Sequence, residues 1–257
     1  MPSWNPDTYE RFKTYRDRPA LDLLLQIPAD LDPREIWDLG CGTGEHAAVL
    51  AARHPNARAH GLDSSAEMLS RARTRQADVD WIQADLADFT PETPPDLIFT
   101  NAALQWAPDH AVLIPRLASS LAGEGVFACQ MPAAHNSAWH VALRELVGEA
   151  AWAGRFRQVR GVQPVETPER YYDWLSPICA EVDIWTTTYL HVLEGGDPAV
   201  EWMRGTALRP YLDVLTELAE QEAFLADYRQ RVRAVLPPRA DGTTLFPFPR
   251  LFILARR

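Results

Sequence analysis

The sequence predicts an α/β fold built on a doubly wound, mostly parallel sheet of seven strands, with helices on both faces and a helical insertion toward the C-terminus. Short apolar runs alternate with segments of helical periodicity through the first half of the 257-residue chain. Alternating strands and helices of this length are typical of parallel sheets with right-handed crossovers. The composition indicates a globular protein, because 47% of the residues are apolar and 23% are charged. The length favours one domain with an insertion over two domains.

The first elements follow a strand, turn and helix order. An amphipathic helix is expected from Tyr9 to Leu25, before Pro28. The run EIWDLG then leads into a glycine-rich turn, and the helical segment AAVLAARH after it stops before Pro55. The same order repeats, with strands expected at 57–63, 79–85, 95–101 and 126–132, and helices at 65–76 and 110–125. Sheets of this kind bind ligands at the carboxyl ends of their strands.

The second half of the chain combines helices with two late strands. The stretch AAHNSAWHVALRELVGEAAW is helical, and residues 153–168 are expected to form a loop. The alternating segment EVDIWTTTYLHVL, residues 181–193, predicts a strand, as does the closing TLFPFPRLFILARR. PAVEWMRGTALRPYL and EAFLADYRQRVRAVL lie between these strands and have helical periodicity. We therefore interpret residues 1–257 as a single domain with a helical insertion at 195–240.

Charge and cysteine content exclude several classes of function. The formal net charge of −10 repels nucleic acid and anionic lipid, so an anionic small molecule needs a local cluster of cations. Cys41, Cys129 and Cys179 are far apart and odd in number, which predicts reduced thiols and neither a disulfide framework nor a zinc site. The N-terminus lacks an apolar signal core, and no apolar run is long enough to cross a bilayer. We expect a soluble cytoplasmic protein without a metal.

Three glycines at alternate positions, Gly40, Gly42 and Gly44, follow the first strand. A tight turn without a ligand is one interpretation. A phosphate-binding P-loop would need a lysine and a serine or threonine after the last glycine, where Glu45 and His46 stand. A dinucleotide fingerprint would need a glycine at the position of Glu45, whose carboxylate would repel a pyrophosphate at the helix N-terminus. The pattern that remains is a G-x-G-x-G turn that binds no phosphate.

Acidic residues stand at three successive strand ends. Asp38 precedes the glycines and can attract an ammonium group, while Asp63 ends the second strand and can accept both hydroxyls of a ribose. Asp85 ends the third strand, where it can accept the exocyclic amine of adenine. Ser64 is the expected N-cap of the helix that carries Met68. Any one of these acids could be a solvated helix cap, but three together favour a cationic nucleoside ligand without phosphate.

The motifs DLGCGTG, GLDSS, QADL and PDLIFTNAALQW occur in the order and spacing of class I S-adenosylmethionine-dependent methyltransferases, which the chain resembles. The resemblance implies a Rossmann-like fold and S-adenosyl-L-methionine as the cofactor. The pair Glu45 and His46 departs from the small polar residues common in that family. The cofactor-binding residues that the resemblance implies are Asp38, Gly40, Cys41, Gly42, Gly44, Asp63, Ser64, Met68, Asp85, Leu86, Asn101 and Ala102.

More narrowly, the full chain resembles the methyltransferases that esterify trans-aconitate. The segments WNPDTYERF, LIFTNAALQWAPDH, QMP, LRPYL and FPRLFILARR carry this resemblance. It implies in-line transfer of a methyl group to one carboxylate of a small polycarboxylate, giving the monomethyl ester. A carboxylate is already ionised at neutral pH, so no general base is needed. Another small di- or tricarboxylic acid is an alternative substrate, and a catalytically silent cofactor-binding domain is an alternative function. We expect a monomer with no nucleic-acid or membrane partner.

The resemblance also suggests residues that bind the substrate, with cations holding the carboxylates that do not react. Arg209 and Arg250 are the candidate clamps, although a lone arginine is more often a surface charge or part of a structural ion pair. Residues 1–30 are expected to form a helical lid, and His110 and His135 to be structural. Gln105 and Trp106 are the expected positioning residues. The full substrate-binding set is Trp4, Arg16, Arg18, Gln105, Trp106, Arg209, Tyr211 and Arg250.

Overall fold

The structure is a computed structural model that describes residues 13–159 and 164–257, without the side chains of residues 13, 14 and 16. The described residues divide into two compact units, which we call unit 1 and unit 2. Unit 2 comprises Arg18–Pro132, Val165–Thr187 and Arg250–Arg257. Unit 1 comprises the described residues before Arg18, those of Ala133–Pro164, and Thr188–Pro249. The insertion expected at 195–240 falls within unit 1, which also takes in 133–164, a segment that the sequence pattern does not assign to it.

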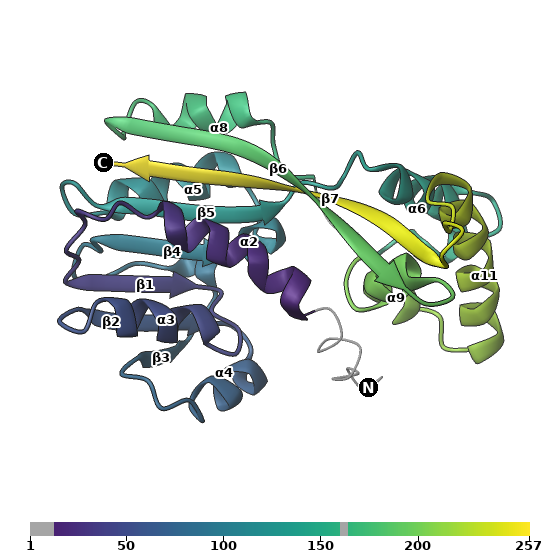
Figure 1. Cartoon of the computed structure of the whole chain (residues 1–257), viewed down its shortest axis with the longest axis horizontal. Helices are drawn as coiled ribbons and strands as arrows, with labels where there is room; N and C mark the ends of the chain where they lie inside the picture. Colours follow the sequence, from purple (N-terminus) through teal and green to yellow (C-terminus); the bar gives the residue numbers. More distant parts are fainter. Residues whose placement is uncertain (1–12, 160–163) are drawn as a thin grey trace. The chain divides into compact units, whose positions relative to one another are not determined.

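A seven-stranded sheet with the order β3-β2-β1-β4-β5-β7-β6 confirms the predicted fold class (Figure 1). The first five strands are parallel, and β7 is antiparallel to β5. The boundaries between the two units fall inside β6 and β7, after Thr187 and Pro249. The strands are β1 Glu35–Leu39, β2 Arg58–Asp63, β3 Asp80–Gln83, β4 Leu97–Asn101, β5 Val126–Pro132, β6 Glu181–Glu194 and β7 Thr243–Arg256. Each strand that the sequence predicts is therefore present.

Helices cover both faces of the sheet in unit 2. Helix α3 packs on β1 and β2, α4 packs on β2 and β3, and α5 packs on β5 and on α8. Right-handed crossovers place α3 and α4 on one face and α5 on the other, because the chain leaves the centre of the sheet in opposite directions. These helices are α3 Glu45–Arg53, α4 Ala66–Ala72, α5 His110–Ser120 and α8 Pro168–Leu175, with short 3-10 turns η1 Leu86–Asp88 and η2 Leu104–Trp106; α2 Lys13–Gln26 crosses a unit boundary.

Helix α8 is an element that the sequence pattern does not predict. It begins at Pro168, a favourable first residue of a helix, and buries Tyr171 and Leu175 at a spacing of one turn. Two buried positions in eight residues give a weak periodic signal. The helix is stabilised by its contact with α5, which sequence periodicity does not reveal.

Unit 1 is a helical unit around an aromatic core. Its helices are α6 Ala138–Gly148, α7 Ala153–Phe156, α9 Pro198–Arg204, α10 Arg209–Leu212 and α11 Leu218–Val235. The core includes Trp139, Trp202, Phe246 and Phe248, whose rings contact one another. Tyr228 of α11 donates its hydroxyl hydrogen to the carbonyl of Trp139 at 3.1 Å, so this buried phenol is satisfied. Helix α7 lies in the segment 153–168 that the sequence suggests is a loop.

The three cysteines are buried free thiols in unit 2. Burial raises the pKa of each thiol, with the negative charges of Asp38 and Asp63 adding to the effect at Cys41. Within the described residues, no helix is both long and apolar enough to span a bilayer.

Candidate active site

The glycine turn joins the end of β1 to the start of α3. The N–H groups of Gly40 and Cys41 both donate to the carbonyl of Leu62 in β2, at 2.7 and 2.9 Å. The N–H of Gly44 donates to the carbonyl of Cys41 at 2.9 Å, and α3 begins at the next residue. The turn is therefore tied to the carboxyl end of the neighbouring strand as well as to itself.

The three glycines of the turn have positive φ, but only one of them faces open space. A Cβ atom added at Gly40 would lie 2.2 Å from Cβ of Ala103, and one at Gly44 would lie 2.4 Å from the ring of Trp81. A Cβ atom added at Gly42 would have no atom of the described chain within 4 Å. Packing against neighbouring side chains therefore explains why Gly40 and Gly44 have no side chain. At Gly42 the missing side chain leaves room for a ligand to approach the backbone.

Asp38 is a buried acid directly below this turn, with 1% of its surface exposed. It accepts a hydrogen bond from the N–H of Ala47, while Oδ2 has no hydrogen-bond partner in the described part of the chain. Burial, with smaller contributions from the negative charges of Asp63 and Glu45, raises its pKa to about 8. A positively charged group at this position would favour the ionised carboxylate, so Asp38 suits an ammonium ligand.

Asp63 lies at the end of β2 and organises two segments at once. Its Oδ2 accepts from the N–H of Gly42 at 2.9 Å, and its Oδ1 accepts from the N–H of Ser65 at 2.8 Å. The helix α4 is capped by Ser65, whose Oγ accepts from the N–H of Met68 at 3.3 Å. The expectation that Ser64 is the N-cap is wrong, because the turn held by Asp63 delays the helix by one residue.

Asp85 and Leu86 follow β3, where Asp85 is exposed. Its Oδ1 accepts from the N–H of Ala87 at 2.8 Å and caps the short turn η1. Asp85 therefore has a local capping function, and one carboxylate oxygen remains for a ligand. Leu86 is half-buried beside Gly40, since its Cδ2 would lie 3.8 Å from an added Cβ there.

The segment after β4 holds side chains close to the glycine turn. Ala102 adopts φ 52°, which is unusual for a residue with a side chain, and its N–H donates to the carbonyl of Gln130 at 2.9 Å. Gln105 is buried and donates from Nε2 to the carbonyl of Ala102 at 2.6 Å, whereas Trp106 is 58% exposed. The turn therefore directs Gln105 inward and Trp106 outward.

His110 supports this segment from the start of α5. Its Nε2 lies 2.8 Å from the carbonyl oxygen of Leu104, which can only accept, so Nε2 carries the proton. Its Nδ1 then accepts from the hydroxyl of Tyr171 at 2.7 Å, and that hydroxyl accepts from the N–H of Glu166 at 3.2 Å. Both ring nitrogens are engaged, in agreement with a structural role.

Glu45 does not act as an isolated negative charge. Its carboxylate is paired with the guanidinium of Arg75, which also donates from Nε to the carbonyl of Thr43 at 2.5 Å. The sequence argument that Glu45 repels a pyrophosphate therefore needs correction, because Arg75 offsets much of its charge. The arginine is 30 residues away in the sequence, and no local pattern indicates the pair. The absence of a P-loop lysine and the presence of Asp38 remain as arguments against a phosphate ligand.

The predicted substrate residues are divided between the two units. Arg250, on β7 in unit 2, is 4% exposed. Arg209 begins α10 in unit 1, where it is exposed, with its Nε 3.8 Å from Asp213. Tyr211 is buried in unit 1 with its ring 5.1 Å from that of Phe156, and Arg18 is exposed 3.9 Å from Asp22. Trp4 and the side chain of Arg16 lie outside the described residues.

All the predicted cofactor residues belong to unit 2, as do Gln105, Trp106 and Arg250. All the cofactor residues except Met68, which lies in α4, are at or just after the carboxyl ends of strands. Gln130 lies in the same place and is missing from the sequence-based set. It is buried in β5 within the otherwise apolar run VFACQMP. A single amide inside a buried strand is the signal that identifies it, because such a side chain needs a hydrogen-bond partner.

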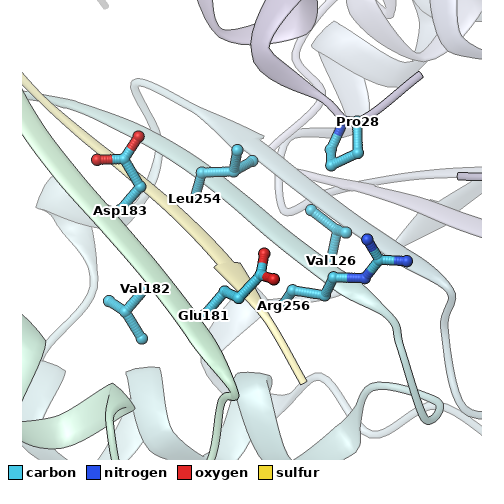
Figure 2. A pocket seen from close by; sticks show the side chains of 7 residues that line it. All are labelled: Pro28, Val126, Glu181, Val182, Asp183, Leu254 and Arg256. Atoms are coloured by element: carbon cyan, nitrogen blue, oxygen red, sulfur yellow. The ribbon is translucent and has the colours of Figure 1, made fainter. Parts of the chain in front are cut away.

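A small pocket lies at the opposite ends of the strands from the glycine turn, where β5 and β6 begin and β7 ends (Figure 2). Arg256 at this pocket is held by Asp30, with Nη1 3.2 Å from Oδ2. The predicted ligand residues are absent from its lining, which consists of Pro28, Val126, Glu181, Val182, Asp183, Leu254 and Arg256. The glycine turn and the acidic strand ends therefore remain the candidate site.

Comparison with known proteins identifies the family. Residues 36–125 match the Methyltransferase domain family. A trans-aconitate 2-methyltransferase from Azoarcus sp. (strain BH72) is 46% identical over 100% of both chains, and one from Methylobacterium nodulans is 46% identical over 100% of this chain and 99% of the relative.

Among solved structures, the YcgJ protein of Bacillus subtilis has a TM-score of 0.62 with 15% identity, covering 93% of this chain and 98% of that one. A Haemonchus contortus phosphoethanolamine N-methyltransferase 2, solved with S-adenosylhomocysteine, has a TM-score of 0.55 with 15% identity, covering 93% of this chain and 52% of that one. At this identity the two structures support the fold alone. The full-length sequence similarity is decisive: the chain belongs to the trans-aconitate 2-methyltransferase family.

Proposed function

We propose that the protein transfers a methyl group from S-adenosyl-L-methionine to one carboxylate of trans-aconitate and forms the monomethyl ester. The observation that carries the proposal is the similarity to trans-aconitate 2-methyltransferases over the full length of the chain. This similarity extends through both units, and therefore beyond the part of the chain that matches the general methyltransferase domain.

The residues at the strand ends suit this cofactor, which supplies an electrophilic methyl group on a sulfonium when it is bound. Asp38 offers a buried carboxylate oxygen to the ammonium of the methionine part. Gly42 provides open backbone, and Asp63 retains lone pairs for the ribose hydroxyls after accepting its two backbone hydrogen bonds. Asp85 would accept from the adenine amine of the bound cofactor, and Asn101 and Ala102 would contact the cofactor beside its methyl group.

The acceptor side of the reaction requires positioning rather than proton transfer. Carboxyl groups titrate near pH 4, so the attacking oxygen is ionised at neutral pH without a base. The protein's residues have to hold this oxygen in line with the methyl carbon and exclude water. In a chain with a net charge of −10, the buried guanidinium of Arg250 supplies local positive charge for a carboxylate that does not react.

Arg250→Gln is expected to raise KM for trans-aconitate by about 10- to 100-fold, because a hydrogen bond to a charged group contributes roughly 1.5–3 kcal/mol. The Kd for S-adenosylhomocysteine should change little. Arg209→Gln is assayed beside Arg250→Gln, and an unchanged KM would remove this exposed arginine from the candidate clamps. Steady-state kinetics measures KM for trans-aconitate, and calorimetric titration measures the Kd for S-adenosylhomocysteine, so the effects on the two ligands can be distinguished.

Arg204→Gln is the matched control, since Arg204 is an exposed helical arginine whose Nη1 lies 3.4 Å from Glu201. If Arg250→Gln weakened the binding of S-adenosylhomocysteine and of trans-aconitate equally, Arg250 would not be a substrate clamp. A methyl-transfer assay with trans-aconitate, cis-aconitate, isocitrate and citrate tests the substrate. Binding of S-adenosylhomocysteine without transfer to any of these acids would favour a silent cofactor-binding domain.

A further inference from the structure

Gln130 is a polar residue inside an apolar strand. Its side chain is 1% exposed, and neither Nε2 nor Oε1 has a hydrogen-bond partner among residues 13–159 and 164–257. The residues around it in β5, 126–129 and Met131, are buried and apolar. A buried amide without a partner destabilises the folded state. Its presence here indicates a partner that lies outside the described residues.

Two more side-chain amides lie at the same end of the sheet. The register of β4 and β5 pairs Asn101 with Gln130, so both side chains point to one face. Gln105 is linked to them through Ala102, which accepts from its Nε2 and donates to the main-chain carbonyl of Gln130. In the described structure, Oδ1 of Asn101 and Oε1 of Gln105 also have no partner. We call Asn101, Gln105 and Gln130 the amide cluster.

Arg250 brings a positive charge to this face of the sheet. Gln130 of β5 pairs with Phe252 of β7, and Arg250 lies two residues from Phe252. Residues two apart in a strand share a face, and diagonal neighbours in an antiparallel pair are about 7–8 Å apart, within reach of long side chains. The sheet therefore presents a buried cation next to uncharged amides.

The amide cluster also adjoins the glycine turn. Ala103 lies between Ala102 and Gln105 in the sequence, and its Cβ occupies the space that a side chain at Gly40 would need. Asp38 pairs with Phe99, two residues before Asn101, so Asp38 lies on the same face as the cluster. An acceptor at the cluster would therefore lie next to the proposed cofactor site.

We propose that Gln130 donates a hydrogen bond from Nε2 to the carboxylate that is methylated, while Arg250 binds a carboxylate that is not. A cation on the reacting carboxylate would withdraw charge from the attacking oxygen and make it a poorer nucleophile. A neutral amide orients the same oxygen with less loss of nucleophilicity. This inference rests on the proposed function and specifies which group holds the reacting end of the acceptor.

Gln130→Met tests the assignment, because methionine has a similar shape and no polar group. We expect KM for trans-aconitate to rise about 10-fold, in line with the loss of one hydrogen bond to a charged group. The Kd for S-adenosylhomocysteine should stay within about twofold, and the melting temperature should be equal to that of the wild type or higher, because a buried amide without a partner is removed. Gln130→Glu, which replaces the donor with a carboxylate, should raise KM further.

Thr100→Val is the control, since Thr100 is fully buried in β4 and its Oγ1 also has no partner in the described chain. Its side chain points to the opposite face from Asn101, so KM should not change. If the wild type methylates trans-aconitate and Gln130→Met leaves KM unchanged, this inference fails and the proposed function stands. If Gln130→Met weakened the binding of S-adenosylhomocysteine and of trans-aconitate equally, the inference would also be overturned. If the wild type methylates no polycarboxylate, both the inference and the proposed function fail.

Discussion

Asp38→Asn is expected to weaken binding of S-adenosylhomocysteine by about 100-fold, because a charge-assisted hydrogen bond to the ammonium contributes up to roughly 3 kcal/mol. The asparagine retains an oxygen for the N–H of Ala47 but has no negative charge. The same substitution should stabilise the protein without ligand at neutral and alkaline pH. Binding and stability should therefore change in opposite directions.

The sign of the stability change follows from the pKa of Asp38. Burial raises this pKa from 3.8 to about 8, so between these values the folded state binds more protons than the unfolded state. The contribution of Asp38 to the free energy of unfolding therefore falls as pH rises through this range, by up to about 1.4 kcal/mol per pH unit. The melting temperature of the variant, measured relative to the wild type, should rise between pH 5 and pH 8 and then level off.

Calorimetric titration checks the binding half of this prediction. At pH 7, a cationic ligand should drive a proton from Asp38, and the wild type should release this proton where the variant does not. Asp85→Asn is the comparison, because Asp85 is exposed and its substitution removes no buried carboxyl group. Unchanged affinity for S-adenosylhomocysteine in Asp38→Asn would exclude Asp38 from the site.

Gly40→Ala and Gly42→Ala are expected to have different effects although they lie in one turn. An added Cβ at Gly40 overlaps Cβ of Ala103 at 2.2 Å with φ 74°, which should lower the free energy of unfolding by about 3–5 kcal/mol. An added Cβ at Gly42 meets no described atom within 4 Å, so only the strain of φ 56° remains, about 1 kcal/mol. Gly42→Ala should therefore fold but bind S-adenosylhomocysteine poorly.

Gly242→Ala is a control for backbone strain, since Gly242 has φ 79° and, within the described residues, open space around an added Cβ. It should lose about as much stability as Gly42→Ala and retain full affinity for S-adenosylhomocysteine. Chemical denaturation measures the stabilities, and calorimetry measures the affinities. Wild-type affinity in Gly42→Ala would show that no ligand approaches the backbone there.

The sheet could be predicted from the sequence because each strand carries its own pattern. Buried strands such as 126–132 are nearly continuous apolar runs, the long strand β6 alternates in polarity, and β7 contains the apolar run 251–255. The short helices α7 and α8 could not be predicted, since too few residues define a period and tertiary contacts stabilise them. The extent of unit 1 depends on contacts between distant segments, which no local pattern contains.

The predicted site depended on the type and position of residues at strand ends, and the structure places these residues at one edge of the sheet. Pairwise contacts were not predictable. The ion pair of Glu45 and Arg75 joins residues far apart in the sequence, and Ser65 replaces Ser64 as a cap because Asp63 binds the intervening turn. Gln130 was predictable in principle as the polar residue in a buried run, but its lack of a partner is visible only in the folded chain.

The positions of the cysteines allow the unfolding of unit 2 to be followed by chemical labelling. Cys41, Cys129 and Cys179 all belong to unit 2, and their burial and raised pKa values keep them as protonated thiols at neutral pH. The thiolate is the nucleophile that attacks an alkylating reagent, so modification requires these buried thiols to open to solvent and ionise. The rate of alkylation of the natural cysteines therefore reports the rate of local unfolding in unit 2. Unit 1 does not contribute to the measured rate, because the three cysteines all lie in unit 2.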